Sequence, residues 1–98
     1  MPPAQLRALY DFALQDATTR IDRLEALAAA GDQTALRSGA HALKGSAAMI
    51  GATHLRNLAA DLETGQMLVE PKTIAQLHKA AAEIRHILDS FSRQTDDL

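Results

Sequence analysis

The stretch that decides the fold runs from Gly31 to Gly51 and reads GDQTALRSGAHALKGSAAMIG. Its apolar residues recur at steps of four and three, the spacing of one buried stripe on an α-helix; they are Leu36, Ala40, Leu43, Ala47 and Ile50. Gly31 is a typical helix stop and Asp32 a typical N-cap, so a tight turn is expected before this helix. Gly51 marks its end. The stretch therefore predicts a helix over 33–50 between two turns.

Comparable apolar stripes lie on both sides of this helix. The upstream stripe predicts a helix over 3–30 that begins at Pro2-Pro3; its members are Leu6, Leu9, Tyr10, Ala13, Ala17, Ile21, Leu24, Leu27 and Ala28. A shorter stripe predicts a helix over 53–64, with Thr53 as a candidate cap; its members are Leu55, Leu58, Ala59 and Leu62. The last predicted helix covers 71–92 and begins at Pro71; its stripe consists of Ile74, Leu77, Ala81, Ile84, Leu88 and Phe91. Residues 66–70 are expected to form a loop with an apolar plug at 67–69, and residues 92–98 are expected to fray.

The composition favours helices over strands. Twenty of the 98 residues are Ala and fourteen are Leu, whereas Val occurs once and aromatic residues make up 3%. Ala and Leu lead the helix scale, and the residues that favour strands are scarce. Consecutive helices joined by short turns pack as antiparallel neighbours. We therefore expect an all-α fold, an antiparallel up-down-up-down four-helix bundle forming one domain over 1–98.

Composition also excludes several classes of function. There is no cysteine, so disulfides, thiolate chemistry and Cys-based zinc sites are absent. No apolar run approaches the roughly 20 residues of a membrane span, and no signal sequence is recognisable. The net charge of −2 and the lack of a Lys/Arg-rich run argue against nucleic acid as the main partner. We expect a cytoplasmic protein that does not bind membranes, and a monomer, because four helices already close a bundle.

One histidine of the 33–50 helix lies off the apolar stripe. His41 follows Ala40 by one residue, about 100° around the helix, so its ring is expected to face outward. The residues around it at helical spacings are Arg37, Ser38, Lys44, Gly45 and Ala48. Gly45 leaves one flank of the ring open at a cost of roughly 0.5–1 kcal/mol against Ala, and Gly39 is interpreted in the same way.

Charge around His41 points to phosphate chemistry. No Asp or Glu occurs between Gln33 and Ala60, whereas Arg37, Lys44 and Arg56 fall within that range. An exposed imidazole is a nucleophile when neutral, and a phosphoryl group on it carries about two negative charges that Lys44 can offset. These residues predict an electropositive zone around a phosphate-accepting histidine.

The same residues resemble a known family. The run His41-Ala-Leu-Lys44-Gly45-Ser46, followed by Gly51-Ala52, Leu55 and Leu62-Glu63, is similar to the motif of the histidine-containing phosphotransfer (HPt) domain. The motif covers residues 40–63, and the four predicted helices agree with that family's fold. Gly39 departs from the pattern, which usually has a better helix former at this position.

The resemblance implies a phosphocarrier in a two-component phosphorelay. His41 would be phosphorylated by a receiver-domain aspartyl phosphate and pass the group to another receiver aspartate, and Lys44 would stabilise the phosphoryl group. Arg37, Ser38, Gly45 and Ala48 are expected to contact the partner, which is a response-regulator receiver domain or part of a hybrid sensor kinase. The partner would supply Mg²⁺, and this chain would bind no cofactor. It carries no recognisable ATP-binding motif, so it is expected to be neither an autokinase nor an enzyme.

Three alternatives remain at this point. A histidine kinase dimerisation domain usually has an acidic residue after its histidine, where this chain has Ala42. A metal-binding bundle needs closely spaced ligands, whereas His41, His54, His78 and His86 form no i,i+3 or i,i+4 pair. A non-catalytic helical docking module for a signalling protein is the third, and His54 is a candidate docking residue beside Leu55.

Overall fold

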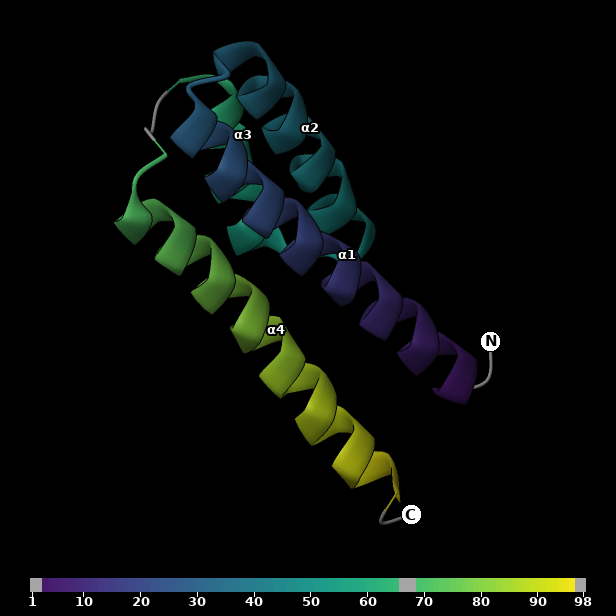
Figure 1. Ribbon diagram of the computed structural model, residues 1–98. Helices are drawn as coiled ribbons and strands as arrows, with labels where there is room; N and C mark the ends of the chain where they lie inside the picture. The colour runs from purple at the N-terminus through teal and green to yellow at the C-terminus, as the bar shows by residue number, and fades with distance from the viewer. Residues whose placement is uncertain (1–2, 66–68, 97–98) are drawn as a thin grey trace.

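The computed structural model describes the backbone of residues 3–65 and 69–96, and the side chains of residues 4–65 and 69–90. Four helices and no strand occur in this part of the chain: α1 (Pro3–Ala30), α2 (Gln33–Met49), α3 (Thr53–Glu63) and α4 (Pro71–Asp96) (Figure 1). The prediction of an all-helical chain with four helices is confirmed for these residues. Each helix begins where it was expected, whereas α4 continues to Asp96 instead of ending at 92. Of the apolar plug expected at 67–69, residues 67 and 68 lie outside the described residues.

A glycine turn and a side-chain cap connect α1 to α2. Gly31 has φ +72°, a conformation that costs glycine little because it has no Cβ. The Oδ1 atom of Asp32 then accepts a hydrogen bond from the Ala35 amide at 3.1 Å. This bond satisfies one of the backbone donors that a helix start leaves unpaired. The predicted turn at Gly31 and N-cap at Asp32 are thus both present.

The connection from α2 to α3 also depends on a glycine. Gly51 has φ +69°, and the Ala52 amide donates to the Ala47 carbonyl at 2.9 Å. The N-cap of α3 is Ala52, whose side chain makes no capping hydrogen bond, and Thr53 is the first helical residue. The expectation that Thr53 caps α3 was therefore wrong. Ala52 is buried, so apolar packing fixes this helix start.

The core consists of most of the predicted stripe positions and four further residues. Most of the stripe residues from α2 and α3 are buried, as are Ile21 and Leu24 of α1 and Leu77 of α4, whereas Ile50 and Leu58 are half-buried at the edge of the core. Further buried residues that the stripes did not include are Leu14, Ala52, Thr73 and Ala80. Each is next to a stripe residue or one helical turn from it, so the buried face is wider than a single line of positions.

Contacts between α1 and α4 support the predicted antiparallel orientation of these two helices. The up-down-up-down arrangement of all four helices stays a prediction. Three polar pairs join them: Arg7 with Asp89, Asp11 with Arg85, and Asp22 with His78. From the first pair to the third, the residue numbers increase along α1 and decrease along α4, as in two antiparallel helices. α2 packs against α1 and α3, and α3 also contacts α4.

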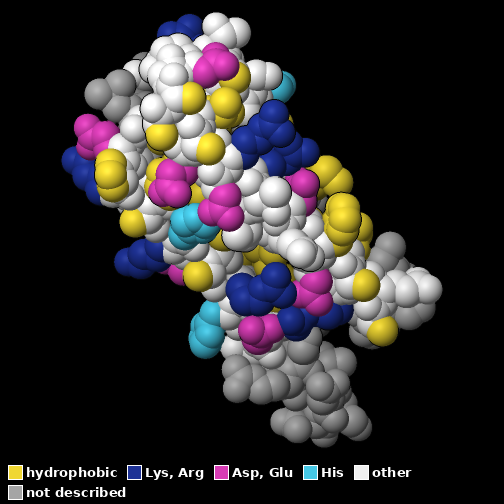
Figure 2. All heavy atoms as spheres, in the orientation of Figure 1, with side chains coloured by type: hydrophobic (Ala, Val, Ile, Leu, Met, Phe, Trp, Pro, Cys, Tyr) yellow, Lys and Arg dark blue, Asp and Glu magenta, His cyan; other side chains and the backbone are white. Residues whose placement is uncertain are grey.

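One end of the molecule contains only two helices. α1 and α4 extend beyond α2 and α3, which gives dimensions of 50 × 23 × 19 Å (Figure 1). Leu6 and Leu9 were expected in the buried stripe but are 37% and 48% exposed. They lie in the part of α1 that α2 and α3 do not reach. Basic and acidic side chains lie next to one another over α1 and α4, with exposed apolar side chains between them (Figure 2).

No helix in the described part of the chain has both the length and the apolar character required to cross a bilayer.

Candidate functional site

His41 lies near the middle of α2 and points away from the core. Its side chain is 68% exposed, whereas Ala40 and Leu43 on the same helix are fully buried. Helical geometry accounts for the difference, because one residue corresponds to about 100° of rotation. The predicted outward position of His41 agrees with the structure.

Glu63 of α3 bridges His41 and Lys44. Its Oε1 atom lies 2.8 Å from His41 Nδ1, and its Oε2 atom lies 2.6 Å from Lys44 Nζ. Leu62 and Leu43 are buried immediately beside these residues, so packing between α2 and α3 fixes the separation of the three polar side chains. Glu63 was noted in the sequence only as the end of a motif. Its contacts depend on how α3 is rotated against α2, which the periodicity of either helix does not specify.

The charge on Glu63 is maintained by its neighbours. The hydrogen bond from Lys44 lowers the pKa of the Glu63 carboxyl below its usual value, the bond with His41 adds to this effect, and desolvation opposes it. The carboxylate is therefore ionised at neutral pH. In the unphosphorylated protein, the positive charge of Lys44 is balanced by the negative charge of Glu63.

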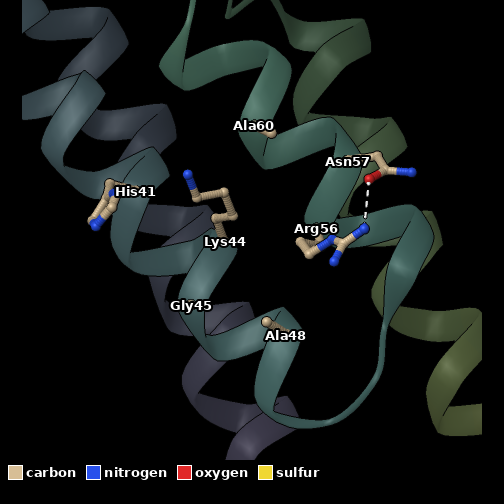
Figure 3. A pocket seen from close by; sticks show the side chains of 7 residues that line it. All are labelled: His41, Lys44, Gly45, Ala48, Arg56, Asn57 and Ala60. Carbon is tan, nitrogen blue, oxygen red and sulfur yellow. Dashed lines mark hydrogen bonds between the residues drawn. The ribbon is translucent and has the colours of Figure 1, made fainter.

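The contact with Glu63 also assigns the proton on the His41 ring. An ionised carboxylate has no proton to donate, so in the neutral ring Nδ1 carries the proton and donates it to Oε1. The lone pair is then on Nε2, the other ring nitrogen. His41 lies on the outer side of α2, whereas Lys44 reaches into the space between α2 and α3 (Figure 3).

A shallow groove lies between α2 and α3 beside His41. Its volume is about 420 Å³, and its lining residues are His41, Lys44, Gly45 and Ala48 from α2 with Arg56, Asn57 and Ala60 from α3 (Figure 3). A Cβ atom built on Gly45 would meet no atom within 4 Å. The predicted open flank of His41 is therefore present, and small residues keep the groove accessible.

The structure brings some of the predicted contact residues together and not others. Lys44, Gly45 and Ala48 share the groove with His41. Arg37 and Ser38 are exposed on α2 but do not line this groove. Arg56 and Asn57, which the sequence interpretation did not include among the contact residues, do line it. They could have been found by asking which α3 residues share the side of Glu63 at helical spacing.

One sequence interpretation of this region was wrong. Gly39 was interpreted as leaving space beside His41, but a Cβ atom on Gly39 would lie 3.0 Å from Leu24 Cδ2. Gly39 thus allows α2 to approach α1 closely. The zone around His41 was predicted to be electropositive because 33–60 contains no acid, and folding adds one carboxylate from outside that range, Glu63, which contacts both His41 and Lys44.

Ser46, the last residue of the HxLKGS run, faces α1. Its hydroxyl donates to Asp16 Oδ2 at 2.9 Å, and Arg20 donates to the same oxygen at the same distance. Arg20 chiefly, with Ser46, lowers the pKa of the Asp16 carboxyl. Ser46 therefore joins two helices and does not line the groove.

The remaining histidines lie apart from this site. His54 Nδ1 is 3.9 Å from Glu83 Oε2 of α4, so His54 faces α4 and not His41. His78 Nε2 is 3.1 Å from Asp22 Oδ1 at the edge between α4 and α1, and His86 is exposed. Among the side chains described, those of residues 4–65 and 69–90, no group of three or more His, Asp or Glu has an arrangement that could hold a metal ion.

Comparison with known proteins gives one family. The family model described as "Hpt domain" matches residues 8–87, which is most of the chain and includes His41, Lys44 and Glu63. No curated protein and no solved structure matches the chain. Hpt domains interact with receiver domains and have a phosphotransfer role in two-component signalling. The resemblance found in residues 40–63 thus extends over all four helices, and the chain belongs to the Hpt domain family.

Proposed function

We propose that this protein is a phosphorelay intermediate whose His41 accepts a phosphoryl group from one receiver aspartate and passes it to another. The observation that carries the proposal is the contact between Glu63 and Nδ1 of His41, which leaves Nε2 facing outward beside the bare flank of Gly45. A nucleophile held in one tautomer, next to open space, suits attack on a group presented by another protein.

The proposed transfer balances without another reactant. The Nε2 lone pair of His41 attacks the phosphorus of an aspartyl phosphate, an N–P bond forms, and the P–O bond to aspartate breaks. Aspartate leaves as a carboxylate, while the ring keeps the proton on Nδ1 and gains positive charge. The Glu63 carboxylate stabilises that charge. In the second half of the relay, the carboxylate of another receiver attacks phosphorus and the bonding pair returns to Nε2.

Lys44 is proposed to offset the charge of the phosphoryl group. Its ammonium contacts the same carboxylate as His41, so it is one side chain away from the reacting nitrogen. A loose phosphoryl transition state depends on positioning and charge neutralisation more than on covalent chemistry by the protein. Lys44 supplies the charge neutralisation, and the rigid α2 helix supplies the positioning.

The proposal assigns the remaining chemistry to the partner. The receiver brings the aspartate and Mg²⁺, and this chain binds neither a cofactor nor ATP, so it acts as a phosphocarrier and not as an autokinase. Arg37, Ser38, Gly45 and Ala48 are proposed as partner contacts. We further propose a cytoplasmic monomer, with a hybrid sensor kinase as a further candidate partner and without nucleic acid or membrane binding.

Transfer from a panel of phosphorylated receiver domains tests the proposal. Wild type is expected to gain acid-labile, base-stable label in the presence of Mg²⁺, and His41→Gln is expected to gain none. Because His41 is exposed, the melting temperatures of the two proteins should agree closely. If folded wild type gains no label from any receiver, the helical docking module replaces the phosphocarrier. A large loss of stability in His41→Gln would contradict the outward position of the ring.

A further inference from the structure

The cations of the α2/α3 groove differ in how their charges are balanced. Lys44 forms an ion pair with Glu63 at 2.6 Å. Arg56 also lines the groove, yet among the described residues no carboxylate lies within ion-pair distance of its guanidinium. Its guanidinium donates a hydrogen bond to the neutral amide oxygen of Asn57 at 3.4 Å. With the imidazole neutral, Arg56 therefore gives the groove its net positive charge.

Arg56 is too far along α3 to act mainly on the reacting phosphoryl group. It precedes Glu63 by seven residues, which corresponds to about 10 Å along a helix that rises roughly 1.5 Å per residue. Glu63 contacts the His41 ring directly, so Arg56 lies about two turns from that contact. Its guanidinium lies by the groove at the level of Ala48, beyond Lys44 (Figure 3). This position is beside the reaction and inside the surface that a partner bound at His41 would cover.

We propose that Arg56 is a specificity-determining residue that pairs with a carboxylate of the partner receiver domain. The inference rests on the proposed function, because the receiver must first dock at His41. An acidic side chain entering the groove would pass the small residues Gly45, Ala48 and Ala60 and meet a planar guanidinium that binds carboxylates in bidentate fashion. Charge complementarity thus selects receivers with an acid at the matching position and disfavours those with a base there.

This role has a kinetic signature that distinguishes it from a catalytic one. A charge pair at the rim of an interface acts mainly on association and is weakened by salt. Loss of Arg56 should therefore raise the receiver concentration needed for half-maximal transfer, with a much smaller effect on the rate at saturation. A residue that stabilised the phosphoryl group itself would change the saturated rate.

The test uses the full chain and the receiver domain that labels wild-type His41 fastest. Transfer rates are measured against receiver concentration for wild type, Arg56→Gln and Arg56→Glu, at low and high NaCl. Lys79→Glu is the matched control, since it makes the same change of charge at an exposed position of α4. Melting curves check that all variants fold. As a further step, acidic residues of the receiver are changed to Lys one at a time and combined with Arg56→Glu.

We expect the half-saturating receiver concentration to rise on the order of tenfold for Arg56→Glu at low salt, less for Arg56→Gln, and little for Lys79→Glu. The difference should shrink at high salt, and one receiver acid→Lys change should restore transfer to Arg56→Glu. Equal behaviour of Arg56→Glu and Lys79→Glu, with wild type labelled, would overturn this inference and leave the proposed function standing. A fall confined to the saturated rate would also overturn it. No label on wild type from any receiver would overturn both.

Discussion

The orientation of His41 depends on a residue 22 positions further along the chain. Glu63 binds Nδ1 of the ring through one oxygen and the Lys44 ammonium through the other. One carboxylate thus sets the tautomer of the proposed nucleophile and also holds the cation proposed to receive the phosphoryl charge. Because the two contacts share a group, changes at Lys44 and Glu63 should not be independent.

A double-mutant cycle at Lys44 and Glu63 tests this coupling. Lys44→Ala is expected to slow phosphoryl transfer about tenfold and to shorten the lifetime of phosphohistidine, since it removes a cation and leaves the Glu63 carboxylate unbalanced beside the incoming group. Adding Glu63→Gln removes that repulsion and should recover part of the rate. The measurement is the single-turnover transfer rate of the four proteins. Strictly additive effects would show that Lys44 and Glu63 act separately.

The lowered pKa of Glu63 also predicts a pH dependence of stability. The carboxyl has a lower pKa in the folded chain than its ordinary value of 4.5, so its ion pair stabilises the fold above that pH and loses this effect as the pH falls through the pKa of the folded state. Wild type should therefore exceed Glu63→Gln in melting temperature more at pH 7 than at pH 3. Thermal melts followed by circular dichroism at both values check the sign. If the difference in melting temperature between wild type and Glu63→Gln were larger at pH 3 than at pH 7, the lowered pKa of Glu63 would be contradicted.

At the scale of a single helix, α2 contains two glycines with different surroundings. Gly45 faces open space, whereas a Cβ atom on Gly39 would lie 3.0 Å from a methyl group of the buried Leu24. Helix propensity favours Ala over Gly equally at both positions, by roughly 0.5–1 kcal/mol. Packing therefore decides how the two substitutions differ.

Gly45→Ala is expected to stabilise the fold by about 0.5–1 kcal/mol, which corresponds to a rise of a few degrees in melting temperature for a domain of this size. The same variant should weaken receiver binding, because the added methyl group projects into the groove beside His41. Gly39→Ala should show no such gain, since crowding of Leu24 offsets it. Melting curves and receiver titrations of both variants are the measurements. A larger rise in melting temperature for Gly39→Ala than for Gly45→Ala would show that the contact between α1 and α2 can accommodate an additional methyl group.

Apolar periodicity is sufficient to predict which residues of a single helix lie on the same side. The spacing along α2 placed Lys44, Gly45 and Ala48 around His41, and these three line one groove with it, because neighbours on one helix are fixed by its rise and rotation. Glu63 and Arg56 belong to another helix, and their positions depend on the rotation and offset of α3 against α2. The role of Gly39 was missed for the same reason, since it depends on Leu24 of α1.

Over the whole molecule, the packing changes from four helices to two. The stripe on α1 specifies which side faces α4, but it does not specify how far α2 and α3 extend, so the exposure of Leu6 and Leu9 could not be predicted. Polar contacts instead join α1 and α4 in this region. Arg7 contacts Asp89, donates to the Leu88 carbonyl at 2.9 Å and pairs with Asp11 on its own helix. Arg85 pairs with Asp11 as well.

Arg7→Ala should therefore loosen one end of the molecule and leave the other unchanged. We expect amide hydrogen exchange to become faster in the last turns of α4, from about residue 85 onward, with little change in the buried segment around Leu77. The melting temperature should change little, because exposed ion pairs contribute modestly. Phosphoryl transfer at His41 should be unaffected. Uniformly faster exchange across all helices would show that this polar network supports the whole bundle.

The two-helix end has a practical consequence for studying the protein. Pro3 at the start of α1 and Asp96 at the end of α4 both lie at this end, whereas His41 lies on α2 within the four-helix part (Figure 1). Fluorophores, affinity tags or surface tethers attached at either terminus would thus be held clear of the groove. Immobilised protein should present His41 to a receiver in free solution, and probes placed on both termini should report on opening of the α1/α4 end without obstructing the relay.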